Sequence, residues 1–253
     1  GHSGVDGHAP HDVARPPATP IPPLDAADRA AAFPVLRHDG MQHPDAPVGY
    51  LAFDRLEAWD GDHGTGQAWE IGGWYGGDIH RLWLRSEGQR SGGRTASASI
   101  DLLYGRSVSA WWDVVVGVRH DAAPGASQDW LAVGVQGLAP YLVEVSATAH
   151  VGSAGRTRLE LEAEYDLLLT NRLILQPVLE AGFYGKADPA RGHGSGLATA
   201  EAGLRLRYEI DRRFAPYVGL VHERSFGETA ALRAAAGGRS RDSHVVAGIR
   251  FWF

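Results

Sequence analysis

Short runs in which apolar and polar residues alternate strictly dominate the chain from Tyr50 onward. The clearest is Arg158-Leu-Glu-Leu-Glu-Ala-Glu-Tyr165, and residues 144–151, 201–208 and 245–253 repeat the pattern. A period of two separates an apolar face from a charged face only in a β-strand, because a helix would spread the glutamates around its circumference. These runs therefore predict strands with one apolar face.

Twelve strands are predicted from these runs and from the turn residues between them. They span residues 50–58, 66–74, 79–87, 95–104, 110–119, 129–137, 141–151, 156–166, 171–184, 197–210, 213–224 and 241–253. Short turns (75–78, 105–109, 138–140, 167–170 and 211–212) alternate with longer polar loops (59–65, 88–94, 120–128, 185–196 and 225–240), apart from the short connection 152–155. This alternation is typical of an all-β, twelve-stranded antiparallel up-and-down transmembrane β-barrel with its turns in the periplasm. An even strand number places both ends of the barrel on the periplasmic side.

The hydropathy of the chain excludes a helical membrane protein and leaves a barrel open. Hydrophobic residues make up 44% of the 253 residues, yet the mean hydropathy is −0.22. The longest apolar stretches, such as residues 114–118, are far shorter than the roughly 20 residues that a transmembrane helix needs. Barrel strands keep average hydropathy low because lipid-facing and lumen-facing residues alternate. A soluble β-sandwich or barrel is the alternative, but it would have to pair all these apolar faces into a core.

Three further features bear on the class of protein. Aromatic residues cluster near the predicted strand ends, as the interfacial girdles of a membrane barrel require: Trp69, Trp74, Trp83, Trp111, Trp112, Trp130, Tyr141, Tyr184, Tyr208 and Tyr217. The last strand ends in Phe253, which is similar to the signal by which bacterial outer-membrane barrels are recognised for assembly. The net charge of −6 leaves no basic surplus for nucleic acid, and the absence of cysteine excludes disulfides and thiolate sites.

The first 47 residues differ in composition from the rest of the chain. They hold nine of the fourteen prolines and five of the twelve histidines. Such a segment buries little apolar surface and cannot offset its ordering entropy. We expect residues 1–49 to be a Pro/His-rich, mostly disordered periplasmic tail with a short helix over residues 25–32, and residues 50–253 to form the barrel.

Several motifs in the barrel region resemble one family. They include Asp54-Arg-Leu-Glu57, Gly73-Trp-Tyr-Gly-Gly-Asp78, Leu82-Trp-Leu-Arg-Ser-Glu-Gly88, Leu103-Tyr-Gly-Arg106, Gly117-Val-Arg-His-Asp121, Gly137-Leu-Ala-Pro-Tyr141, Glu164-Tyr-Asp-Leu167 and Phe214-Ala-Pro-Tyr217. In this order they resemble the copper resistance protein B family (CopB/PcoB). The resemblance implies a Gram-negative outer-membrane protein, encoded with other copper-handling proteins, that helps to move or sequester copper. It also implies a periplasmic multicopper oxidase as a partner, besides outer-membrane lipid and copper ions.

The tail offers one candidate copper site. Imidazole and thioether groups are copper ligands, and the softer Cu(I) favours methionine. His38, Met41 and His43 lie within six residues, so a flexible loop could bring all three to one ion. The alternative is a polar linker, because a flexible site must also be ordered when it binds metal.

The second candidate site is the barrel lumen. Strand parity places Glu160, Glu162 and Glu164 inward as candidate metal-binding groups, together with Arg158. The other candidates for an inward ion path are Glu70, Asp101, Asp113, Glu144, His150, Glu180, Glu201 and Glu209, interleaved with Arg119, Arg205 and Arg207. One interpretation is an acidic, cation-selective passage. The other is a network of Glu–Arg pairs that fills and rigidifies a narrow barrel.

Catalytic residues are scarce in the sequence. Asp242, Ser243 and His244 are adjacent, but neighbours in a strand point to opposite faces and cannot form a relay there. We therefore expect a monomeric, non-catalytic barrel that binds or conducts copper ions through an acidic lumen. Two alternatives stay open: a barrel enzyme of the lipase or protease type, and a structural anchor that docks a periplasmic copper oxidase.

Overall fold

The computed structural model describes residues 25–32, 47–61 and 64–253. The chain divides into two units, Gly1–Pro44 and Asp45–Phe253. The first unit contains α1 (Ala26–Ala32), at the position where a short helix is predicted, while most of the tail for which disorder is predicted lies outside the described residues. The second unit contains all the described strands. None of the helices in the described ranges has the length and apolar character to cross a membrane.

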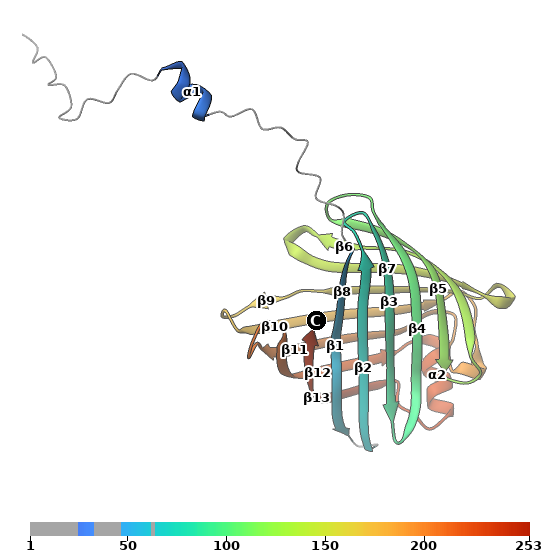
Figure 1. The fold of residues 1–253 in the computed structure, drawn as a ribbon. Coiled ribbons are helices and arrows are strands. Elements are labelled where there is room, and N and C mark those ends of the chain that lie inside the picture. Colours follow the sequence, from blue (N-terminus) through green and yellow to red (C-terminus); the bar gives the residue numbers. More distant parts are fainter. Residues whose placement is uncertain (1–24, 33–46, 62–63) are drawn as a thin grey trace, which may run out of the picture. The chain divides into compact units, whose positions relative to one another are not determined.

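The strands of the second unit form one closed antiparallel sheet (Figure 1). They are β1 (Val48–Gly61), β2 (Gly64–Gly76), β3 (His80–Ser91), β4 (Arg94–Ser107), β5 (Trp112–Ala123), β6 (Gln128–Ala139), β7 (Val143–Gly152), β8 (Thr157–Glu164), β9 (Leu167–Leu168), β10 (Leu173–Tyr184), β11 (Gly196–Tyr208), β12 (Phe214–Ser225) and β13 (Arg241–Trp252). Successive strands pair in order, and β1 pairs with β13 to close the barrel. Because β8 and β9 both pair with β10, they make one interrupted strand, and the predicted twelve-stranded barrel is confirmed.

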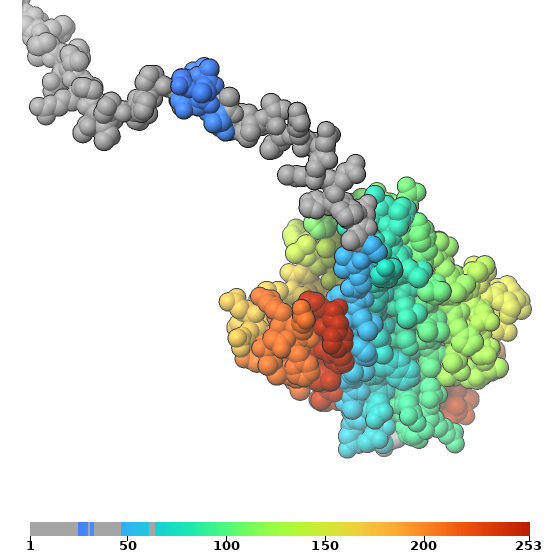
Figure 2. Space-filling view, viewed as in Figure 1, coloured from blue at the N-terminus to red at the C-terminus, as the bar shows by residue number. Residues whose placement is uncertain are grey.

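The two faces of the sheet have opposite polarity, as the alternation predicts. On β5, the side chains of Val114, Val116 and Val118 point outward and are 38%, 52% and 49% exposed, whereas those of Val115 and Arg119 point inward and are 1% and 7% exposed. An apolar outer face stays exposed without cost only where lipid covers it. Figure 2 shows β1–β4 side by side as a continuous outer wall of the barrel.

Three predicted loops are wrong. Residues 59–65, 88–94 and 120–128 belong largely to strands, since pairing continues to Gly61↔Gly64, to Ser91↔Arg94 and to Asp121↔Gln128. The second hairpin turns at Gly92 and Gly93, whose φ angles of +55° and +77° suit a two-residue turn that glycine adopts without strain. Polar residues can continue a strand above the apolar band, where water solvates the outward side chains.

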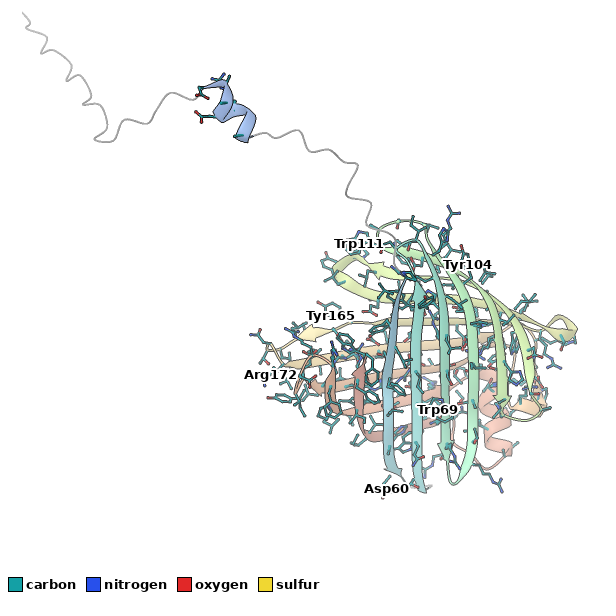
Figure 3. All side chains as sticks on the ribbon, in the orientation of Figure 1. Asp60, Trp69, Tyr104, Trp111, Tyr165 and Arg172 are labelled. Carbon is teal, nitrogen blue, oxygen red and sulfur yellow. The ribbon has the colours of Figure 1, made fainter. Side chains whose placement is uncertain are left out.

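Long connections therefore occur at only two places within the described residues, between β10 and β11 and between β12 and β13. The first includes the 3-10 turn η4 (Pro189–Arg191), and the second includes α2 (Gly227–Ala235), which the strand pattern does not predict. Alanine-rich sequence favours the helix because alanine has the highest helix propensity. We call this the loop end of the barrel, and the opposite end, where β1 begins and β13 finishes, the turn end. Figure 3 places Asp60 at the loop end and Trp111 and Arg172 at the turn end.

The predicted aromatic girdles are partly wrong. Trp74 and Trp83 oppose each other on β2 and β3, line the interior and carry Arg81 and Arg85 over their rings. Trp130, Tyr184 and Tyr217 also lie on inward faces, whereas Trp111, Tyr141 and Tyr208 are exposed. The strand parity of each aromatic residue decides its side, and nearness to a strand end does not.

Candidate functional site

The interior of the barrel encloses a cavity of about 1370 Å³ to which all twelve strand positions contribute. Sixteen Asp and Glu residues line this cavity against eleven Lys and Arg residues, an excess of five negative charges. A charged lining of one net sign between low-dielectric walls concentrates ions of the opposite sign. The cavity is therefore suited to cations.

Most of the residues that parity assigns to the interior line this cavity. They are Glu70, Asp101, Asp113, Glu144, His150, Glu160, Glu162, Glu164, Glu180 and Glu201. Glu209 does not line the cavity: β11 ends at Tyr208, and the Glu209 carboxylate pairs with Arg212 at 3.5 Å in the following turn. His38, Met41 and His43 lie outside the described residues.

One ion-pair network is centred on Arg119 of β5, which is 7% exposed. Its guanidinium donates to Glu87 at 2.7 Å and to Asp121 at 2.8 Å, and lies 3.3 Å from Asp101 and 3.4 Å from Glu160. Sequence reasoning misses Glu87 and Asp121, although both have the inward parity of their strands. Because Glu87 comes from β3 and Glu160 from β8, this network ties strands that are not neighbours in the sheet.

A second network is centred on Arg55 of β1. Its guanidinium bonds to Glu70 of β2, lies 2.7 Å from Glu180 of β10 and 3.8 Å from Glu201 of β11. A register shift between Phe53 and Arg55 changes the alternation along β1, which is why simple parity does not single out Arg55. One cation therefore serves three carboxylates from both sides of the lumen.

Two smaller clusters complete the paired part of the lining. Asp113 accepts a hydrogen bond from Ser107 at 2.6 Å and lies 3.4 Å from Arg81. His150 is 1% exposed, lies 3.5 Å from Glu160 and packs edge-on against Trp130. These contacts hold the side chains in fixed positions on the wall, so they support the interpretation of a rigidifying network.

Three carboxylates have a different environment, and we call them the acidic column: Glu144, Glu162 and Glu164. Glu164 faces Glu144 in register, and Glu162 faces Glu180. Their polar contacts are neutral, from Ser146 to Glu162 at 3.5 Å and from Gln176 to Glu164. Within the part of the chain that the structure describes, no Lys or Arg lies within ion-pair distance of the acidic column. Like charges directly opposite each other on neighbouring strands repel. The column thus contributes three carboxylates without an ion-pair partner to the acidic excess of the lumen.

The described residues contain no cluster of three or more His, Asp and Glu side chains arranged to hold a metal ion. The adjacent Asp242, Ser243 and His244 split between the two faces of β13, as predicted. His244 lies 3.4 Å from Asp242, whereas the Ser243 hydroxyl bonds to His222 of β12 at 2.7 Å. The three side chains therefore do not form a relay.

Comparison with known proteins places this barrel in a family. The family model described as "Copper resistance protein B precursor (CopB)" matches residues 48–253, which is the whole barrel. The chain belongs to the copper resistance protein B family. It is 52% identical over 236 residues to a copper resistance protein B homolog of Pseudomonas syringae pv. tomato, covering 93% of this chain and 80% of that protein. It is 46% identical over 236 residues to copper resistance protein B of Escherichia coli, covering 93% and 79%.

Among solved structures, the NanC porin is similar in fold. It superposes with a TM-score of 0.52 at 10% identity and covers 81% of this chain and 99% of the porin chain. At that identity the similarity concerns the fold alone, so this family member has a porin-like barrel. The residues that give the lumen its charge must be interpreted from the chain itself.

Proposed function

We propose that this copper resistance protein B family member binds and passes copper ions through its lumen along the acidic column. The observation that carries the proposal is that Glu144, Glu162 and Glu164 face one another or a fourth carboxylate, Glu180, with no paired cation of their own. The two arginine-centred networks hold the remaining wall in place. A divalent cation entering here offsets repulsion that the barrel otherwise bears.

The spacing of the inward carboxylates along β8 suits stepwise passage of a hydrated ion. Glu160, Glu162 and Glu164 alternate along β8, so successive inward carboxylates are roughly 6.6–6.8 Å apart. Glu160 is paired with Arg119 and Arg158 at the loop side, and the unpaired carboxylates follow toward the turn end. Carboxylate oxygens bind Cu(II) more readily than Cu(I), so Cu(II) is the form that the lumen favours. Binding at several weak sites allows the ion to leave as well as to enter.

The location and orientation belong to the same proposal. The barrel sits in the outer membrane, with its turn end and the tail of residues 1–49 in the periplasm and the loop end outside. Short turns at one end and the two long connections at the other support this orientation. The tail then lies where a periplasmic multicopper oxidase can meet it. The role proposed for the lumen requires ion binding and no catalysis.

The test is copper uptake into proteoliposomes that contain the E144Q/E162Q/E164Q variant. Glutamine keeps the size and hydrogen bonding of the side chains but removes three negative charges. We expect the variant to fold and copper uptake to fall on the order of tenfold, the scale of electrostatic focusing. The matched control is E209Q/D211N/E228Q, which removes three charges outside the cavity and should leave uptake unchanged. Uptake by the folded lumen variant equal to that of the parent would sink the proposal.

A further inference from the structure

The outer face of β12 and β13 changes character toward the loop end. The outward side chains of Val218, Leu220 and Val245 are 56%, 61% and 62% exposed and continue the apolar band. The next outward pair along the strands is His222 and Ser243, which hydrogen-bond to each other at 2.7 Å. This polar pair marks the limit of the apolar band toward the loop end.

Beyond that pair, two arginines stand directly opposite each other. Arg224 of β12 and Arg241 of β13 are partners in the register of the ladder, and both are exposed. Alternate residues on a strand are roughly 6.6–6.8 Å apart, so both guanidiniums lie about one such step beyond His222 and Ser243. Like charges directly opposite in an antiparallel pair are destabilising without a shared counter-ion.

No carboxylate among the described residues supplies that counter-ion. The Arg224 guanidinium lies over the ring of Phe226 at 4.8 Å, which orients it but leaves its charge in place. The acidic residues next to the two arginines in sequence have other partners: Glu223 pairs with Arg233 at 2.6 Å, and Asp242 lies 3.4 Å from His244. By contrast, His120 on the outer face of β5 has its own acid, Asp129, at 2.6 Å on β6.

The neighbouring strand β11 offers room beside this pair. Its outward residues next to Arg224 and His222 are Ala200 and Ala202, while Leu204 and Leu206 lie further along the same face. The small side chains beside the charged pair and the bulkier apolar ones further along suit an acyl chain whose head group reaches the arginines. The guanidinium of arginine binds phosphate oxygens bidentately. The pair is therefore better suited to a phosphorylated head group than to the head group of an uncharged lipid.

We propose that Arg224 and Arg241 bind a phosphate of a phosphorylated outer-leaflet glycolipid, lipid A, on the outer face of β11–β13. The inference goes beyond copper passage and uses only the orientation of the barrel proposed above. The arginines contribute charge and bidentate donors, and the apolar band below them contacts the acyl chains. The site is on the opposite side of the wall from the acidic column.

The experiment measures retention of lipid A by the detergent-solubilised full chain, using native mass spectrometry and titration. The probes are diphosphorylated lipid A and its phosphate-free form. We expect R224Q/R241Q to bind the diphosphorylated form on the order of thirtyfold more weakly than the parent, from two surface arginines at about 1 kcal/mol each. R224K/R241K keeps the charge and should stay within a few-fold of the parent.

The control is R106Q/R172Q, which removes two exposed arginines near the turn end and should bind as the parent does. Equal binding by R224Q/R241Q and the parent overturns the site, as does equal retention of phosphate-free lipid A by the parent. An equal loss in R106Q/R172Q also overturns it, because the effect is then one of total charge. Copper uptake by R224Q/R241Q should match the parent, so failure of this site and failure of the lumen proposal give different results.

Discussion

Arg205 and Glu57 form a bidentate ion pair in the barrel interior, with Nε and Nη2 of the guanidinium 3.1 and 3.0 Å from the two carboxylate oxygens. The residues are 148 positions apart in the sequence and lie on β11 and β1, with β12 and β13 between them. The Tyr217 hydroxyl of β12 donates to the same carboxylate at 3.0 Å. The pair therefore braces the part of the sheet that closes the barrel.

Replacing Glu57 by glutamine should strongly destabilise the barrel. Arg205 is 2% exposed, and removing one partner of a buried ion pair leaves an uncompensated charge at a cost of about 3–5 kcal/mol. Y217F loses one hydrogen bond and should cost only about 1 kcal/mol. Urea unfolding in detergent, followed by heat-modifiable gel mobility, measures both. An E57Q barrel as stable as the parent would show that water reaches the pair.

The depth of an outward-facing charge within the apolar band should decide how much that charge lowers the free energy of folding. Val116 lies in the middle of β5 on the lipid face, so V116R should reduce the free energy of folding into vesicles by about 2–4 kcal/mol. His120 has the same parity nearer the loop end, and H120R should cost about 0–1 kcal/mol. Equal costs for the two variants would contradict a membrane-spanning band at this position. The folded fraction after dilution into lipid vesicles provides the measurement.

The two long connections at the loop end are joined by a buried hydrogen bond. The backbone N–H of Gly194 donates to the Thr229 hydroxyl at 2.8 Å, and Thr229 is 1% exposed. T229V keeps the shape but leaves that N–H without its acceptor, which costs about 1–3 kcal/mol locally. Hydrogen exchange at Gly194 should accelerate, whereas T229S should protect it as the parent does. Unchanged exchange in T229V would mean that another group holds the connection.

Acidification should loosen the connection between β10 and β11 through His193. Burial, together with the nearby Arg158, lowers the pKa of His193 from 6.5 to about 4. The unfolded state therefore binds more protons than the folded state between those two values, so the free energy of unfolding falls as the pH drops from about 6.5 to about 4. Below about pH 4 the His193 contribution changes no further.

The measurement is the thermal midpoint of the heat-modifiable transition at pH 7.5 and at pH 4.5. His193 stacks on Tyr184 at 4.3 Å, so H193Q loses some packing at both pH values. The variant should nevertheless show a smaller decrease between them than the parent. A decrease of the same size in H193Q would assign the acid sensitivity to other groups.

The sequence predicts this fold well because a membrane barrel repeats one simple rule. Lipid outside and water inside impose a period of two on each strand, and runs such as residues 158–165 show it without help from distant residues. The same rule places Glu160, Glu162 and Glu164 inward. It fails where the alternation itself is interrupted, as at the register shift before Arg55. It also fails beyond the strands, as at α2, where lipid no longer constrains the pattern.

What the sequence by itself determined is therefore the barrel, its order of strands and the side on which most charged residues lie. Only the tertiary structure decided which of those charges neutralise one another. Pairing across a lumen depends on which distant strands face each other and on how far a long arginine side chain reaches, and neither is written in a local pattern. Arg55 and Arg205 reach carboxylates on strands far away in sequence, while Glu144, Glu162 and Glu164 face other carboxylates. The acidic column exists because β7 and β8 pair in a register that sets Glu144 opposite Glu164, while β8 and β10 pair in one that sets Glu162 opposite Glu180.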